Sequence, residues 1–176
     1  MPSPNAPASG EAARQLPRYA AGALEVPYLI LGGQEMITQD TVWEEHSHPT
    51  HELLWNERGA STARIGARVW TIASTIGLWI PAGVPHSGFT PAGTWHCAAQ
   101  LSMARTLPLA PGPVAVELTP LLRLLMDRLI NQTLSEHSQA LTEAMILDVL
   151  TPSEHQLSLR IPEHPLLAPV VDAVRA

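Results

Sequence analysis

Lysine is missing from this sequence, and its ten basic residues are all arginines, scattered from Arg14 to Arg175 without a cluster. The formal net charge is −6. Nucleic-acid binding draws much of its affinity from clustered basic side chains that neutralise phosphates. This acidic chain is therefore a poor DNA-binding surface by itself.

Disulfides and membrane-crossing segments are also missing. The one cysteine, Cys97, has no partner for an internal disulfide, and no apolar run approaches the roughly 18 residues that would span a bilayer. The N-terminus lacks the basic start and apolar core of a secretory signal. We therefore expect a cytoplasmic protein with no membrane partner.

Proline is frequent, with 17 copies, and it is poorly tolerated in helices and central strands. Residues 1–17 are rich in proline and small residues without apolar periodicity, which predicts a flexible N-terminal arm. Between residues 18 and 118, short apolar runs end at turn residues about every 8 to 12 positions. This rhythm predicts one mainly β domain, an antiparallel sandwich or barrel.

The apolar period becomes helical after Pro120, so residues 119–153 should form two helices. The second is expected from Ser135 to about Leu150, with Ser135 as its N-cap and Thr151-Pro152 as its end. Its apolar surface would suit a homodimer interface. It could equally cover a sheet or pack on the first helix.

The most informative segment contains His46, His48, His51 and Glu52. In a strand, residues two apart share a face, so His46 and His48 can point at one site, whereas His51 should face outward and be exposed. Glu52 lies four residues after His48. His86 follows a turn made rigid by proline and glycine.

Three imidazoles and a carboxylate suit one divalent transition metal. Zinc is the first choice, and nickel, iron, manganese or copper would also fit. The metal ligands would be His46, His48, Glu52 and His86. The plainer alternative makes these histidines polar residues at the lip of a barrel.

These residues resemble the first motif of the cupin superfamily, a His-x-His pair followed by glutamate and glycine. The matching residues are His46, His48, Glu52 and Gly59. Gln39 or Asp40 stands where the motif begins with glycine. The resemblance implies a jelly-roll-like antiparallel β-barrel.

The second cupin motif, Pro-x-Gly, two residues and His, is similar to Pro81, Gly83 and His86. Gly77 lies two residues too close, and Thr90 replaces the asparagine of the motif. By this resemblance too, His46, His48, Glu52 and His86 would be the four metal ligands.

Among cupins, the barrel followed by two helices resembles the sensor domain of AraC family transcription regulators. Residues 154–176 would then be the linker and the start of a helix-turn-helix DNA-binding domain that is absent here. The resemblance implies an unknown small-molecule effector, a homodimer formed by the C-terminal helices, and DNA contact only through the absent domain.

An effector pocket would be lined by apolar and aromatic groups, and the candidates are Trp43, Trp55, Trp79 and His96. The tryptophans could instead belong to the core, and His96 could be a buried, hydrogen-bonded residue. We expect a regulator rather than an enzyme. The alternatives are a small metal-dependent cupin enzyme, such as a dioxygenase, isomerase or lyase, and a metal-free binding module.

Overall fold

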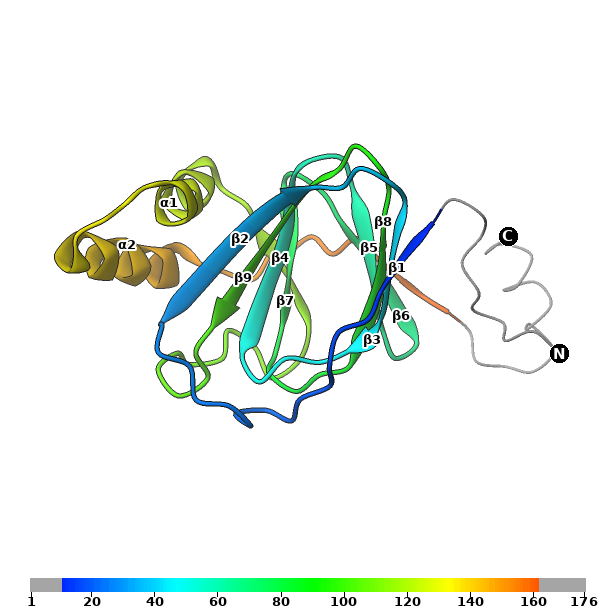
Figure 1. Ribbon diagram of the computed structural model, residues 1–176, viewed down its shortest axis with the longest axis horizontal. Coiled ribbons are helices and arrows are strands. Elements are labelled where there is room, and N and C mark those ends of the chain that lie inside the picture. The colour runs from blue at the N-terminus through cyan, green and yellow to red at the C-terminus, as the bar shows by residue number, and fades with distance from the viewer. Residues whose placement is uncertain (1–10, 162–176) are drawn as a thin grey trace, which may run out of the picture.

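Two facing β-sheets, with two helices against the outer face of one of them, make up the described residues 11–161 of the computed structural model (Figure 1). The six-stranded sheet has the order β1 (Ala12–Arg14), β3 (Thr41–His46), β8 (His86–Thr90), β5 (Ser61–Ile65), β6 (Arg68–Ile72) and β11 (Ser158–Arg160). The five-stranded sheet has the order β10 (Val114–Glu117), β7 (Ile76–Ile80), β4 (His51–Arg58), β9 (Trp95–Leu101) and β2 (Ile30–Met36). The prediction of a mainly β fold followed by two helices is confirmed.

The helices lie where the change of period predicted them. Helix α1 (Pro120–Asn131) begins after Thr119, whose hydroxyl accepts a hydrogen bond from the backbone N–H of Leu122. Helix α2 (Glu136–Val149) begins after Ser135, whose hydroxyl accepts from the N–H of Ser138. Neither helix is long and apolar enough to cross a membrane, and no other helix occurs in residues 11–161.

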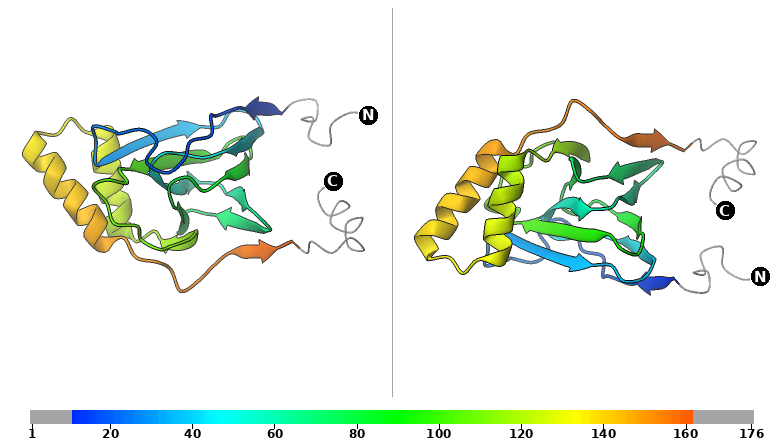
Figure 2. Two further views of the ribbon diagram at one scale, coloured as in Figure 1. Left: turned by 90° about the horizontal axis from the view of Figure 1, so that it is seen from below. Right: turned by 90° about the horizontal axis from the view of Figure 1, so that it is seen from above.

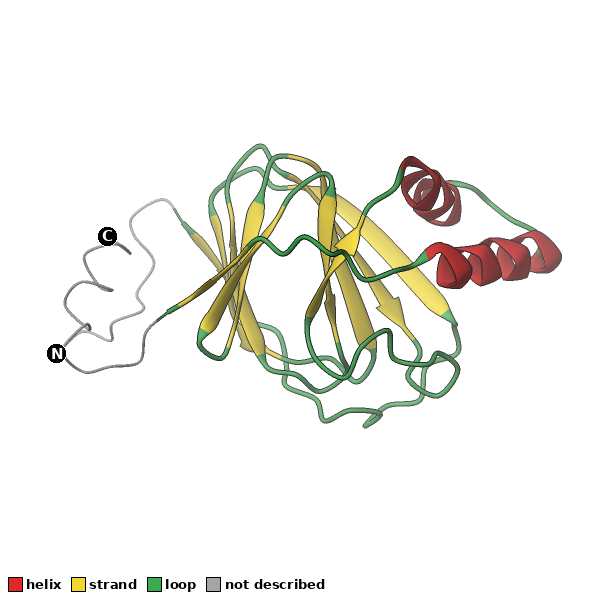
Figure 3. Ribbon diagram, turned by 180° about the vertical axis from the view of Figure 1, so that it is seen from behind, coloured by secondary structure: helices red, strands yellow, loops and turns green. Residues whose placement is uncertain are grey.

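The five-stranded sheet is covered on both faces (Figure 3). Along β4, Leu54 packs between the sheets, whereas Leu53 and Trp55 pack on the helix side. Side chains alternate across a strand, so the two sets belong to two separate cores. The helix-side core is the larger and contains Trp79, Leu122 and Ile146 among others.

The expectation that His51 is exposed is wrong, because its side chain is 5% exposed. As strand alternation predicts, His51 points to the face of the five-stranded sheet opposite to Glu52. The helices cover that face, so it is not exposed to solvent. The imidazole stacks on the Trp79 indole with ring centroids 5.0 Å apart, and its Nδ1 accepts a hydrogen bond from the N–H of Ala82.

Both terminal segments add strands to the six-stranded sheet. The predicted arm pairs in parallel with β3 through β1, and the predicted linker pairs with β6 through β11 (Figure 2). Over residues 11–17, therefore, the arm is not a free coil. The remainder of the predicted arm, residues 1–10, and the predicted start of a DNA-binding domain, residues 162–176, lie outside the described residues.

Gly32 on β2 allows α1 to approach the sheet closely. A Cβ at Gly32 would lie 2.5 Å from Cγ1 of Ile130, whereas a Cβ at Gly33 would meet nothing within 4 Å. Gly32→Ala should therefore lower the free energy of unfolding by about 1–3 kcal/mol through overpacking. Chemical denaturation would measure this change.

Gly33→Ala is the matched control, because both substitutions reduce the entropy of the unfolded chain by the same amount. It should leave stability unchanged or raise it by up to about 1 kcal/mol. Equal destabilisation by the two variants would contradict close packing of α1 at Gly32.

Candidate metal centre

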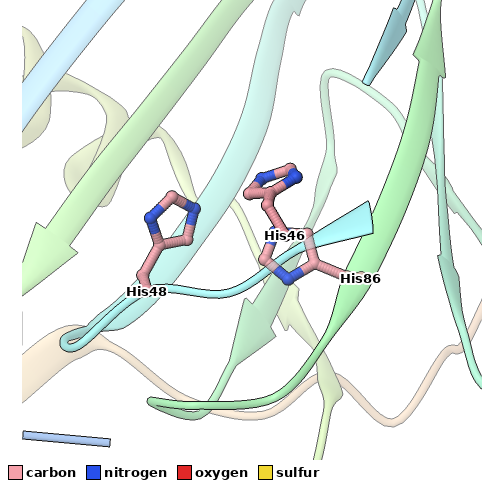
Figure 4. Close-up of side chains that lie close together, drawn as sticks. All are labelled: His46, His48 and His86. Atoms are coloured by element: carbon pink, nitrogen blue, oxygen red, sulfur yellow. The ribbon is translucent and has the colours of Figure 1, made fainter. Parts of the chain in front are cut away.

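Three histidines from separate segments converge between the sheets (Figure 4). His46 ends β3 and lies in register opposite His86, the first residue of β8, while His48 follows in the turn before β4. One ring nitrogen from each histidine lies within 4.8 Å of the others. Strand pairing thus brings together residues that are 40 positions apart in the sequence.

Glu52 joins this cluster from the opposite sheet, since it lies on β4. Its Oε1 lies 3.2 Å from Nε2 of His48, and its Oε2 lies 3.1 Å from Nε2 of His86. Burial alone would raise the pKa of Glu52, but the close imidazoles of His48 and His86 outweigh that effect and lower the pKa well below its ordinary range. The carboxylate is therefore ionised.

Backbone carbonyls orient two of the imidazoles. Nδ1 of His46 lies 2.6 Å from the carbonyl oxygen of Glu44, and Nδ1 of His86 lies 3.0 Å from that of Val84. A carbonyl oxygen only accepts, so each Nδ1 carries the proton that it donates. This arrangement directs Nε2 of both rings toward the cluster, as in metal sites whose ligands are oriented by backbone acceptors.

The cluster fits a divalent transition metal. The buried atoms Nε2 of His48 and Oε2 of Glu52 have no hydrogen-bond partner, although buried polar atoms are nearly always hydrogen-bonded. A metal ion would satisfy both atoms. Three imidazoles and one carboxylate are also a donor set that zinc, manganese, iron, nickel and copper accept.

The turn before His86 depends on Gly83, which has a φ of +75°. Its N–H donates a hydrogen bond to the carbonyl of His48, at 2.8 Å, and a Cβ there would lie 2.7 Å from the backbone nitrogen of Ala21. Only glycine fits this position without strain. The glycine of the second motif thus links the turns that carry His48 and His86.

Sequence reasoning missed two residues behind Glu52. Gln100 Nε2 donates to Oε1 of Glu52 at 2.7 Å, and the Thr50 hydroxyl donates to Oε1 of Gln100 at 2.5 Å. Gln100 lies opposite Glu52 in the register of β4 and β9. No local motif contains Gln100, so only the pairing of these strands could have indicated it.

A cavity of about 310 Å³ opens beside the histidines. Trp43 and His96, two of the predicted ligand contacts, line it, and their ring centroids are 5.4 Å apart. The Trp43 indole N–H donates to the Thr90 hydroxyl at 3.0 Å, and the Arg14 guanidinium lies 4.7 Å from the centre of the indole ring. These contacts fix the orientation of Trp43 at the cavity wall.

Trp55 and Trp79, the other two predicted ligand contacts, are not part of the cavity lining. They are 2% and 0% exposed and belong to the core between the five-stranded sheet and the helices. Strand parity explains the difference, because Trp55 points to the face of β4 opposite Glu52 and Leu54. The structure therefore assigns both tryptophans to packing.

The sequence is similar to that of a transcription regulator. The HTH-type transcriptional regulator NimR of Escherichia coli is 26% identical over 152 residues, which cover 84% of this chain and 54% of the regulator. The chain thus spans about half the length of this relative. No protein-family model matches the chain.

Two solved structures share a looser likeness. A variant of apo ToxT from Vibrio cholerae has a TM-score of 0.38 and 7% identity over 85% of this chain and 49% of ToxT. A variant of oxalate decarboxylase from Bacillus subtilis has a TM-score of 0.36 and 11% identity over 78% of this chain and 36% of the enzyme. The chain is therefore similar in sequence to about half of an HTH-type transcriptional regulator, and its described residues combine a two-sheet β fold with a cluster of three histidines.

Proposed function

We propose that this domain senses a small molecule for a transcription regulator and that His46, His48, Glu52 and His86 hold one divalent transition metal, with zinc as the first choice. The observation that carries the proposal is the largely buried histidine cluster at the wall of a cavity that opens between the sheets. Such a cavity can enclose a small effector, and the metal would order the two sheets around it. An effector would shift the regulator between two states only by its difference in affinity for them.

DNA contact belongs, in this proposal, to a helix-turn-helix domain in another part of the polypeptide. Two features support this division: the absence of a basic cluster in the sequence, and the coverage of only 54% of NimR. The test is to read the gene beyond the codon for Ala176 and assay the whole protein for sequence-specific DNA binding. A gene without such a domain would overturn this part of the proposal.

A homodimer through α1 and α2 is the proposed assembly. Leu124 is 68% exposed, Leu141 55% and Met145 47%, so both helices present apolar side chains away from the core. A dimer would allow two DNA-binding units to reach neighbouring half-sites. Leu124→Glu combined with Leu141→Glu should convert a dimer to a monomer in analytical ultracentrifugation, and an unchanged dimer would exclude this interface.

Protein purified without added metal should contain close to one transition metal ion per chain, and His48→Ala should lose most of it. Removing one ligand of four leaves an incomplete coordination set with a lower affinity. Elemental analysis by mass spectrometry would measure the content, and the same data would identify the metal.

His137→Ala is the matched control, because His137 is exposed on α2 and far in sequence from the cluster. This variant should retain the metal content of the wild type. Wild-type protein that stays empty after exposure to zinc, manganese, iron, nickel and copper in turn would contradict the proposed metal site.

A further inference from the structure

A second polar centre lies at the cavity wall, where Trp43 and His96 line the cavity and Asn56 lies behind His96. Asn56 on β4 is fully buried, and His96 on β9 lies opposite it in the strand register. Trp43 and His96 line the cavity with their rings tilted by 36° to each other. This centre does not include the proposed metal ligands.

The amide orientation of Asn56 follows from its partners. Its Nδ2 donates to the Ser61 hydroxyl and to the carbonyl oxygen of Ile72, both at 2.9 Å. A backbone carbonyl can only accept, so the NH₂ group must face Ile72. The oxygen of the amide, Oδ1, therefore faces His96.

This orientation determines which nitrogen of His96 carries the proton. Nδ1 of His96 lies 3.4 Å from Oδ1 of Asn56. Because this amide oxygen can only accept a hydrogen bond, Nδ1 of His96 must carry the proton that it donates. Burial lowers the pKa of His96, which favours the neutral ring with one proton. With that proton on Nδ1, Nε2 of His96 is a hydrogen-bond acceptor available to the cavity.

The carboxylates at the cavity wall already have charged or polar partners, and this favours an uncharged ligand. Glu35 is held by two hydrogen bonds from Arg14, at 2.6 and 2.9 Å, and Glu52 is engaged by His48 and His86. The described residues that line the cavity include no arginine or lysine. Glu35, which lies opposite His96 in the strand register, is the charged group nearest to it along the pairing of β2 and β9, and the lining also contains the apolar residues Leu54, Ile72 and Ala98.

We propose that the effector is a small aromatic molecule that donates a hydrogen bond, from a hydroxyl or a ring N–H, to Nε2 of His96 beside Trp43. A cavity of about 310 Å³ has room for a ligand of one or two rings. An anionic group offers only hydrogen-bond acceptors. Next to Nε2 of His96, which is itself an acceptor, such a group is disfavoured. The inference rests on the proposed sensing function and adds the chemical class of the ligand, but it does not require the metal.

Phenol and anisole test this directly, because they share a ring and differ in that the methylated oxygen has no proton to donate. In NMR titrations of the whole chain, phenol should bind roughly tenfold more tightly than anisole. His96→Phe removes the acceptor and keeps a planar ring, so it should bring the two affinities together. Equal affinities in the wild type, or no binding of either compound, would overturn the proposal.

Asn56 acts as a positioning residue, and its role has a spectroscopic signature. Long-range ¹⁵N NMR spectra should show the proton of wild-type His96 on Nδ1. Asn56→Leu should shift the proton toward Nε2 and weaken phenol binding while leaving anisole binding unchanged. If that variant does not fold, the wild-type spectrum still decides, because a proton on Nε2 would refute the inference.

The titrations should be repeated after treatment with a chelator, with metal content measured on the same samples. A phenol preference that persists in protein without metal supports the role of His96 even if the proposed metal site is wrong. Protein that contains the metal but binds phenol and anisole equally would overturn this inference and leave the proposed metal site standing. The two proposals can therefore fail separately.

Discussion

Replacing Trp79 with alanine should lower the free energy of unfolding by about 3–5 kcal/mol. The indole is 0% exposed, stacks on His51 and packs in the core between the five-stranded sheet and the helices. Truncation would leave a cavity that rigid strands on one side and helices on the other can fill only in part. The loss is a large share of the roughly 5–15 kcal/mol that stabilises a typical domain. Urea denaturation followed by far-ultraviolet circular dichroism would measure it.

Trp95→Ala provides the comparison, because it makes the same chemical change at a side chain that is 38% exposed. We expect a loss of less than about 1.5 kcal/mol there, which includes the indole hydrogen bond to Gln34. A loss at Trp95 equal to the loss at Trp79 would show that the helix-side core is not the main packing centre. Phenol binding to folded Trp79→Ala protein should persist, since Trp79 is not part of the cavity lining.

Zinc should stabilise the protein strongly at pH 8 and less at pH 6. At a free concentration 100 times its dissociation constant, a ligand of the folded state adds about 2.7 kcal/mol. Protons compete with the metal for Nε2 of the histidines. Each displaced proton would reduce the metal contribution by about 1.4 kcal/mol per pH unit below the pKa of its histidine.

The pKa of His86 sets where this competition begins. Burial alone would lower that pKa, but the adjacent Glu52 carboxylate outweighs it and raises the pKa above its ordinary value of about 6.5. Without metal, the His86–Glu52 pair therefore contributes stability that is fully present below about pH 6.5 and is lost as the pH rises through the raised pKa. Metal binding is strengthened over the same interval, so the difference in Tm between zinc-loaded and metal-free protein should grow from pH 6 to pH 8.

His86→Ala should show no zinc-dependent rise in Tm at either pH, whereas His137→Ala should behave as the wild type does. A rise in Tm that is equal at pH 6 and pH 8 would mean that zinc stabilises the protein without displacing protons from the histidines. Such a result would place the bound zinc somewhere other than this cluster.

Local signals in the sequence were sufficient for much of the fold. Ser135 and the helical period defined the second helix, and turn residues marked strands between residues 18 and 118, but not β1 or β11, which formed in the predicted arm and linker. The histidine motifs indicated a cluster because each motif contains both the ligand types and the turn that orients them. His46, His48, Glu52 and His86 do lie together.

Exposure was harder to predict than side-chain direction. Strand alternation correctly separated His51 from Glu52, but it could not show that helices formed from residues 120–149 would cover the face of His51. The same limit explains Trp55 and Trp79. Gln100 and Asn56 were missed because their roles depend on the pairing of distant strands and on hydrogen bonds that no short motif encodes.

The short terminal strands also bear on the solubility of the domain. β1 and β11 lie at opposite edges of the six-stranded sheet, beside β3 and β6, and each is three residues long. Removing residues 11–17 and 154–161 would leave β3 and β6 with rows of unpaired backbone N–H and C=O groups. Such edges recruit strands from other molecules and promote aggregation, whereas short edge strands that contain arginine, here Arg14 and Arg160, discourage it. Shortened versions of the protein intended for solution experiments should therefore retain both terminal strands.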